Sequence, residues 1–339
     1  MDKFINPLYM TKTDLIYRAE TNENPEEIWN KLQRWRRENG VNILLKDQKK
    51  NNFFFVITNE LKKKVVEIDD LARSNIFEQL DEKSKIEMIR NAQEDEAFYS
   101  SIIEGAHTTK QRTKEMVENK VMPKTKDEKM VLNNYHALMY ILENLHKEID
   151  EKTILDIYEI VKKDTLEEEN ISKGYRDGQN YVSSMEQIIY NPPEAEEVKW
   201  MMSDLIQFIN NDDDKRIHTI IKALVIHFYF VYIHPFYDGN GRTARALTYM
   251  YLLKNGYQFF KFFSISSILK EYRTKYYKSI KNVEDYDNDV TYFILFNLEI
   301  LEKSIRKVSN DFKNQYLLKI ISERIEKKGL ELNERQKKL

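Results

Sequence analysis

The chain has 339 residues and a formal net charge of −2, with 54 Lys and Arg residues against 56 Asp and Glu residues. A charge so close to zero gives no overall field that would draw the molecule to nucleic acid or to an acidic membrane. The composition, with 41% hydrophobic residues but only eight glycines and six prolines, favours a soluble, mainly α protein over a β-sandwich or a disordered chain.

The cysteine content and the apolar segments both indicate the cellular compartment in which the protein is expected. The sequence has no cysteine, which excludes disulfides and Cys-based zinc sites and fits a reducing compartment. The N-terminus lacks the basic start and the unbroken apolar core of a secretion signal. The longest apolar stretch, residues 223–233, is interrupted by His227 and is shorter than the roughly 20 residues that span a bilayer. We therefore expect a cytoplasmic protein without a membrane partner.

Residues 1–60 predict a small N-terminal α+β appendage. Over residues 26–39, four apolar side chains recur at the spacing of one helical face, which predicts a helix. Residues 41–45 and 53–57 are β-prone runs on either side of a polar stretch, which predicts a β-hairpin.

Residues 61–310 predict a helical body. Between its helices, residues 174–193 carry two glycines, a Pro-Pro pair and a β-prone run, which predicts a β-hairpin flap. From residue 311 to 339 the chain becomes highly charged, which predicts a helical extension with a solvated face. Apolar periodicity of the helical kind covers residues 61–170, 198–209, 217–232, 242–254, 265–280 and 290–308.

Residues 234–245, His-Pro-Phe-Tyr-Asp-Gly-Asn-Gly-Arg-Thr-Ala-Arg, join two of these predicted helices. A tight loop explains the two glycines, but it does not require a His, an Asp and two Arg around them. The Gly-Asn-Gly run directly precedes a helix, whose free N–H groups and dipole favour an anion. Arg242 and Arg245 share a face of that helix, so two guanidiniums can hold successive phosphoryl groups. The segment therefore predicts a phosphate site.

Two further side chains give this site its chemistry. Asp238 offers a hard oxygen ligand suited to Mg²⁺, but it is equally suited to cap the following helix, and the sequence leaves both roles open. His234 closes the preceding apolar helix, and Pro235 fixes the backbone after it, which aims the imidazole at the loop. Neutral imidazole, with a reference pKa of about 6.5, can accept a hydroxyl proton at cellular pH.

These twelve residues resemble the Fic motif, His-x-Phe-x-Asp/Glu-Gly-Asn-Gly-Arg-x-x-Arg, at every fixed position. The resemblance implies a Fic-fold helical bundle that transfers AMP from ATP to a Ser, Thr or Tyr hydroxyl of a target protein, and of itself, releasing pyrophosphate. It implies these roles: His234 as general base, Asp238 as Mg²⁺ ligand, Gly239, Asn240 and Gly241 as the hole for the α- and β-phosphates, Arg242 as β-phosphate clamp and Arg245 as γ-phosphate ligand.

The predicted flap is also similar to the family. Residues 174–176 and 190–193 resemble the flanks of the family's flap, which pairs with a segment of the target by strand addition. An ordinary surface hairpin is the alternative. The resemblance assigns target binding to four flap residues: Val182, Ile188, Ile189 and Tyr190.

Residues 100–105, Ser-Ser-Ile-Ile-Glu-Gly, resemble the family's inhibitory signature Ser/Thr-x-x-x-Glu-Gly/Asn. This implies autoinhibition by a helix that precedes the Fic motif and contains Ser100 and Glu104. In the family the Glu pairs with the second arginine, here Arg245, and displaces the γ-phosphate, and in some relatives it also supports removal of AMP. Considered alone, a Glu at a helix end is usually a solvated charge.

Several alternatives stay open. Transfer of UMP, phosphocholine or, as in the Doc branch, a γ-phosphoryl group uses similar chemistry, although that branch carries Lys where Arg242 stands and Ala where Gly239 stands. A regulator that binds nucleotide without turnover is an alternative of another class, against which the intact His234 argues. Residues 330–339 resemble the lead-in to a winged-helix domain, through which nucleic acid would become a partner. The oligomeric state is open, with a homodimer among the alternatives.

Overall fold

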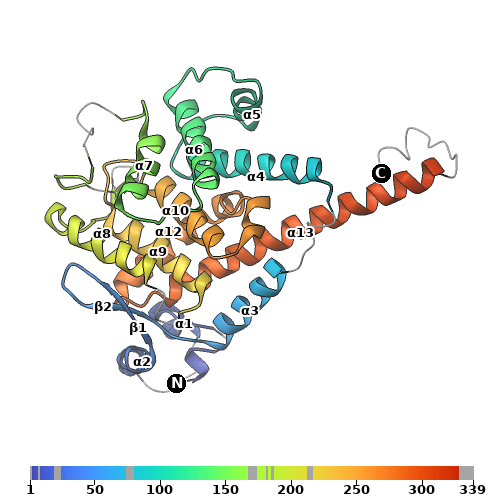
Figure 1. Ribbon diagram of the computed structural model, residues 1–339. Coiled ribbons are helices and arrows are strands. Elements are labelled where there is room, and N and C mark those ends of the chain that lie inside the picture. Colours follow the sequence, from blue (N-terminus) through green and yellow to red (C-terminus); the bar gives the residue numbers. More distant parts are fainter. Residues whose placement is uncertain are drawn as a thin grey trace.

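The computed structural model describes residues 2–6, 8–18, 24–73, 80–166, 174–180, 182–184, 187–211 and 217–327. Helices dominate it, so the prediction of a mainly α fold is confirmed (Figure 1). The helices are α1 (Lys12–Arg18), α2 (Pro25–Asn39), α3 (Asn59–Arg73), α4 (Glu82–Ile103), α5 (Lys110–Glu118), α6 (Lys126–Glu143), α7 (Glu151–Lys162), α8 (Ala195–Asn210), α9 (Thr219–Ile233), α10 (Asn240–Lys254), α11 (Ser266–Leu269), α12 (Arg273–Asp285) and α13 (Thr291–Lys327). Short 3₁₀ helices span Asp2–Phe4, Gln258–Phe262 and Lys270–Tyr272.

The centre of the body is the helix pair α9 and α10. Nearly every side chain of α9 is buried, as expected for a helix that is apolar on all sides. The two helices pack against each other, α8 and α13 pack against α9, and α4, α6 and α7 pack against α10. The turn between them, which carries the Fic-like motif, is therefore held by the most buried elements of the molecule.

The predicted N-terminal hairpin is present as β1 (Val41–Lys46) paired antiparallel with β2 (Asn52–Phe55). Alternate side chains of β2 face different cores. Phe53 and Phe55 belong to the main core of the helical body, whereas Phe54 packs with Trp29 and Leu32 of α2 in a second, smaller core. Because successive side chains of a strand point to opposite faces, β2 contributes to both cores and so joins the appendage to the body.

A buried arginine also fastens the appendage. Arg36 of α2 is 1% exposed, and its Nη1 donates to the hydroxyl of Tyr292 in α13 at 2.5 Å. Its Nη2 donates to the carbonyl of Met10 at 2.9 Å.

The predicted boundaries near residues 60 and 310 fall at the start of α3 and inside α13, and α13 extends as one helix beyond the body (Figure 1).

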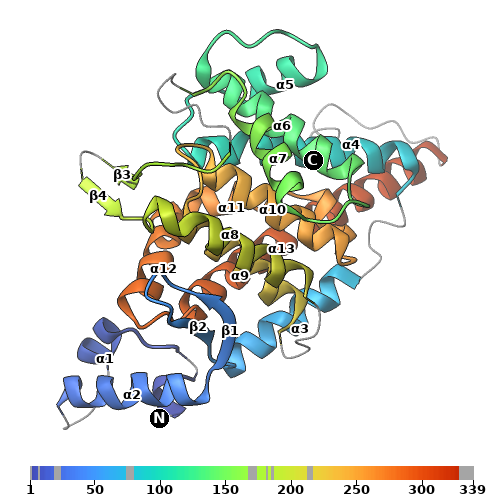
Figure 2. The ribbon, with the colours of Figure 1, turned by 60° about the vertical axis from the view of Figure 1, so that its left-hand side comes forward.

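The predicted flap hairpin is present as β3 (Val182–Ser184) paired antiparallel with β4 (Gln187–Tyr190). It projects from the body next to the start of α8 (Figure 2). The side chains of Val182, Ile188 and Ile189, and the chain from 328 to 339 with its winged-helix-like lead-in, lie outside the described residues.

The apolar periodicity over 265–280 is divided in the structure between α11 and α12 by a 3₁₀ turn. A distant contact explains where α11 begins. Glu96 of α4 accepts hydrogen bonds from the backbone N–H of Ser266 at 3.0 Å and from the hydroxyl of Ser264 at 2.8 Å. A carboxylate at a helix start is favourable, but its source, 170 residues away, cannot be read from local sequence.

Within the described residues, no helix combines the length and the apolar character that crossing a bilayer requires.

Candidate active site

His234 ends α9 in a left-handed conformation, with φ 51° and ψ 58°. Its Nδ1 lies 3.3 Å from the carbonyl oxygen of Val231. Because a carbonyl can only accept, Nδ1 carries the proton, and Nε2 of the neutral ring presents a lone pair. Burial lowers the pKa of His234 to about 4, so the imidazole is neutral at cellular pH and can accept a proton.

The loop after His234 is braced by Asn240. The Oδ1 of Asn240 accepts from the backbone N–H of Phe236 at 2.9 Å, and its Nδ2 donates to the carbonyl of Phe236 at 2.7 Å. Phe236 is fully buried and stacks on Tyr158 of α7. The Asn240 amide thus fixes the loop through its oxygen and one N–H, and its second N–H donor is not used in these two bonds.

Helix α10 begins at a glycine and not at a side-chain cap. Gly239 is the N-cap residue, with φ 82°, and no side chain caps the helix. Asp238, for which capping and metal binding were both open, precedes this position. Its Oδ1 accepts from the N–H of Gly239 at 2.5 Å and lies 3.6 Å from Nη2 of Arg242. With a side chain that is 43% exposed, Asp238 can still offer oxygen to a cation.

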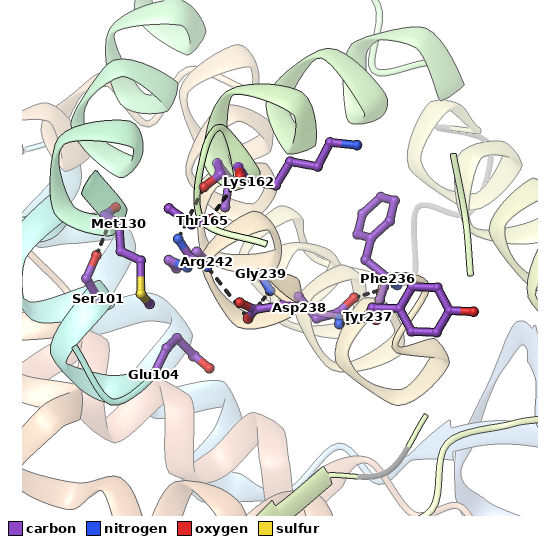
Figure 3. Close-up of polar contacts among 12 residues, drawn as sticks. Ser101, Glu104, Met130, Lys162, Thr165, Phe236, Tyr237, Asp238, Gly239 and Arg242 are labelled. Carbon is purple, nitrogen blue, oxygen red and sulfur yellow. Dashed lines mark hydrogen bonds and ion pairs between the residues drawn. The ribbon is translucent and has the colours of Figure 1, made fainter. Parts of the chain in front are cut away.

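The carboxylate of Glu104 rests on the first turn of α10 (Figure 3). A Cβ added to Gly241 would lie 2.1 Å from Oε1 of Glu104 and 2.6 Å from its Cδ, so only glycine admits this approach. Glu104 follows the last residue of α4, the predicted inhibitory helix. A negative group therefore lies where the free N–H groups and the dipole of α10 favour an anion.

Arg245 binds that carboxylate, the pairing that the family resemblance implied. Its Nη2 donates to Oε1 of Glu104 at 2.8 Å and to the carbonyl of Ser100 at 2.9 Å, and its Nε donates to the Ser100 hydroxyl at 2.7 Å. Burial raises the pKa of Glu104, but the charge and hydrogen bond of Arg245, with the charges of Arg242 and His234, outweigh burial and leave the pKa below its usual value. Glu104 is thus ionised at cellular pH.

Within the motif, three buried guanidinium nitrogens lack a hydrogen-bond acceptor among the described residues. They are Nη1 of Arg245 and both Nε and Nη2 of Arg242. Arg242 is fully buried, and its Nη1 donates to the carbonyl of Val161 at 3.2 Å. Leaving a buried donor unpaired costs about 1–3 kcal/mol, and more for a charged group, so these donors indicate a site for a further anion.

A cavity of about 80 Å³ opens beside the carboxylate. Aromatic and apolar side chains make most of its wall, and polar and charged side chains make the rest, a mixture typical of small-molecule sites. His234, Gly241 and Glu104 line it together with Tyr190, Val231, Tyr276, Tyr277, Ile280, Lys281 and Glu284.

A hydrogen-bond chain that the sequence did not reveal fixes α12, one wall of this cavity, to α9 and α10. Thr248 donates to the carbonyl of Ala244 at 2.7 Å, so its hydroxyl oxygen accepts from Nδ1 of His227 at 3.2 Å. Nε2 of His227 then accepts from the hydroxyl of Tyr276 at 2.8 Å. Burial, with a smaller effect of Arg245, lowers the pKa of His227 to about 3, which keeps this arrangement neutral.

Comparison with known proteins places the central part of the chain in a family. Residues 148–252, which include α7 to α10 and the whole of 234–245, match the model of the Fic/DOC family. The chain contains a Fic/DOC-family domain. The Ser100–Glu104 segment lies before the matched residues of this Fic domain.

Two curated relatives carry the name "Protein adenylyltransferase Fic". The protein from Nematostella vectensis is 32% identical over 173 residues, which are 50% of this chain and 39% of that protein. The protein from Drosophila melanogaster is 30% identical over 212 residues, which are 61% of this chain and 40% of that protein. The chain therefore spans about two fifths of the length of these relatives.

Solved structures support the fold of the Fic domain and its surroundings. A Fic family protein from Desulfovibrio desulfuricans G20 superposes with a TM-score of 0.65 at 22% identity, over 76% of each chain. Fic-1 from C. elegans superposes with a TM-score of 0.62 at 21% identity, over 75% of this chain and 73% of that one. At this identity the likeness concerns the fold alone.

Proposed function

We propose that this chain is a protein adenylyltransferase that moves AMP from ATP to a Ser, Thr or Tyr hydroxyl of a target protein. The names of the curated relatives and the complete Fic motif support this activity. The observation that carries it is the anionic Glu104 held over Gly241 by Arg245, because it marks a built anion site next to the neutral His234.

His234 is the general base of the proposed reaction. The hydroxyl oxygen of the target forms a bond to the α-phosphorus, the bond from that phosphorus to the bridging oxygen breaks, and pyrophosphate leaves. The hydroxyl proton goes to Nε2 of His234, which has its lone pair free because Nδ1 faces the Val231 carbonyl. General-base catalysis by a positioned side chain contributes about 10²–10⁴-fold.

The start of α10 binds the triphosphate in this proposal. The backbone N–H groups of Asn240 and Gly241, in the uncapped first turn, face the phosphates, whereas the N–H of Gly239 donates to Asp238. The donors of Arg242 and Arg245 that lack an acceptor add charge-assisted hydrogen bonds. Asp238 fits Mg²⁺, an ion that takes one or two carboxylates and otherwise phosphate oxygens and water. When bound, Mg²⁺ would neutralise charge that develops on the leaving pyrophosphate.

Glu104 restrains this site in the proposal. The carboxylate and a phosphoryl group cannot both occupy the space over Gly241, because a single Cβ there would already collide with the carboxylate. Binding of ATP in the productive position thus requires Arg245 to exchange Glu104 for phosphate.

The flap binds the second substrate, the target protein, in this proposal. The pairing of β3 with β4 leaves the hairpin with outer strand edges, and an extended segment of the target can add to such an edge through main-chain hydrogen bonds. Tyr190 at the end of β4 also lines the cavity beside His234, so a segment on the flap would lie close to the base.

The test is transfer of label from ATP in the Glu104→Gly variant, with the chain itself as acceptor. Intact-mass spectrometry should show added AMP, and label should come from α-³²P and not from γ-³²P ATP. The Glu104→Gly/His234→Ala variant is the control and should stay unmodified. Label from γ-³²P ATP alone would overturn AMP transfer in favour of phosphorylation, and calorimetric ATP binding without any label would favour a nucleotide-binding regulator.

A further inference from the structure

Arg176 lies in the loop before the flap, and its side chain reaches the turn that carries His234. It is 2% exposed. Its Nε donates to the carbonyl of His234 at 2.9 Å, and its Nη2 donates to the carbonyl of Ile233 at 3.4 Å. Its backbone N–H donates to the carbonyl of Pro235 at 2.8 Å. One residue therefore binds three successive carbonyls around the base.

These bonds stabilise a backbone that is unfavourable by itself. His234 has a positive φ, which for a residue other than glycine costs on the order of 1–3 kcal/mol. The last carbonyls of α9 also carry the negative end of the helix dipole, which a cation offsets. Because a guanidinium is planar and donates in fixed directions, it sets the orientation of these carbonyls more narrowly than an ammonium can.

The same guanidinium holds both ends of the flap. Its Nη1 donates to the carbonyl of Gly178 before β3 at 3.1 Å, and its Nη2 also donates to the carbonyl of Pro193 after β4. Asn180 adds a second connection, since its Nδ2 donates to the carbonyls of Phe236 at 3.1 Å and Tyr237 at 3.0 Å. The flap base and the catalytic turn are thus one hydrogen-bonded unit with Arg176 at its centre.

We propose that Arg176 is a positioning residue, which fixes the His234 turn relative to the flap so that a hydroxyl on the flap meets Nε2 of His234. The expected effect on rate rests on the proposed AMP transfer, but the expected position of His234 relative to the flap does not. Arg176 makes no hydrogen bond to the groups that would hold the phosphates, so its loss should affect the chemical step more than nucleotide binding.

The tautomer of His234 gives a readout besides turnover. Burial is the largest cause of the lowered pKa of His234, and the charge of Arg176 lowers it further. The hydrogen bond to the Val231 carbonyl raises this pKa, as do the charges of Glu104, which follows α4, and of Asp238 in the motif loop. Loss of Arg176 removes a charge that lowers the pKa but also loosens the turn that holds the Val231 hydrogen bond, so the two changes oppose each other in the pKa. The share of the Nδ1–H tautomer reports on the turn and not on the charge.

The first experiment measures turnover in the Glu104→Gly background. We expect Arg176→Met to lower kcat by about 10- to 100-fold, the loss that misplacement of a catalytic group by about 1 Å can cause, with KM for ATP within about twofold. Guanidinium at non-denaturing concentration should restore part of kcat in Arg176→Ala, because it can refill the space of the lost side chain. Equal losses in kcat and ATP affinity, with no rescue, would overturn the proposal.

The second experiment does not depend on turnover, which separates this proposal from the proposed function. In ¹⁵N-histidine NMR, Arg176→Met should reduce the Nδ1–H tautomer of neutral His234, because the turn no longer holds Nδ1 against the Val231 carbonyl. Arg176→Lys keeps the charge without the planar donor set and should reduce this tautomer as well. Arg36→Met removes an equally buried arginine far from the motif in sequence and should lower stability without changing the His234 signals. An unchanged His234 tautomer in Arg176→Met contradicts the positioning role even if the chain transfers no AMP.

Discussion

Oε1 of Glu104 lies 2.8 Å from Nη2 of Arg245, across 141 residues of chain. The contact joins the end of α4 to the first turns of α10 and places a carboxylate over Gly241. A partly buried, charge-assisted hydrogen bond of this kind is among the strong ones, so the resting molecule holds its own anion in the site proposed for phosphate.

We predict that graded removal of this anion raises activity in steps. Glu104→Gly frees both Arg245 and the space over Gly241, and should raise AMP labelling by roughly 10- to 100-fold, which corresponds to the 1.5–3 kcal/mol of a hydrogen bond to a charged group. Glu104→Gln keeps the size and an acceptor oxygen but loses the charge, and should fall between wild type and Glu104→Gly. Label incorporation per minute measures the series. Equal activity of all three proteins would show that the ion pair does not restrain the enzyme.

A second prediction concerns Gly241. In the Glu104→Gly background, Gly241→Ala places a methyl group where the carboxylate lay, so we expect ATP binding to weaken at least tenfold in calorimetry. The same change should raise stability by about 0.5–1 kcal/mol, because alanine favours a helix over glycine. Lost binding together with retained or increased stability distinguishes a blocked anion site from misfolding. Unaltered ATP affinity would place the phosphates elsewhere.

The Tyr276–His227 hydrogen bond should contribute to stability. Tyr276→Phe leaves Nε2 of His227 buried without a donor, and we expect a loss of about 1–3 kcal/mol in the free energy of unfolding. Tyr277→Phe is the matched control, since Tyr277 is adjacent on α12 but only half-buried, and should change stability by about 0.5 kcal/mol or less. Urea unfolding compares the two, and similar losses would contradict this assignment.

Stability should also depend on pH through His227 and His234. Their pKa values in the native state, about 3 and about 4, lie below the value of about 6.5 in the unfolded chain. The unfolded state therefore binds protons first as the pH falls, so the stability is complete above about pH 6.5 and is lost toward the native pKa values. Each histidine contributes a slope of up to about 1.4 kcal/mol per pH unit in this window.

His227→Gln isolates one of these contributions. Glutamine retains an acceptor and a donor but does not titrate. Urea unfolding between about pH 7 and pH 5 should give a mean slope smaller than that of wild type by about 1 kcal/mol per pH unit. Identical slopes in the two proteins would mean that His227 binds protons equally in the native and unfolded states.

Several features could be predicted from the sequence because their causes are local. The buried character of α9 follows from its unbroken apolar run, and both hairpins follow from β-prone runs around turn residues. The motif itself predicted an anion site at a helix start, since two glycines, an amide and two arginines serve that purpose over a few residues. The pairing of Glu104 with Arg245 was expected only from the resemblance to a family.

Tertiary structure decided what depends on packing between distant segments. The stacking of Phe236 on Tyr158, which lies 78 residues earlier in the chain, depended on packing between α7 and the motif loop, and the neutrality of His227 and His234 depended on burial. The role of Arg176 was invisible because its acceptors are carbonyls, which every residue carries, and only folding brings those of Ile233, His234 and Pro193 around one guanidinium.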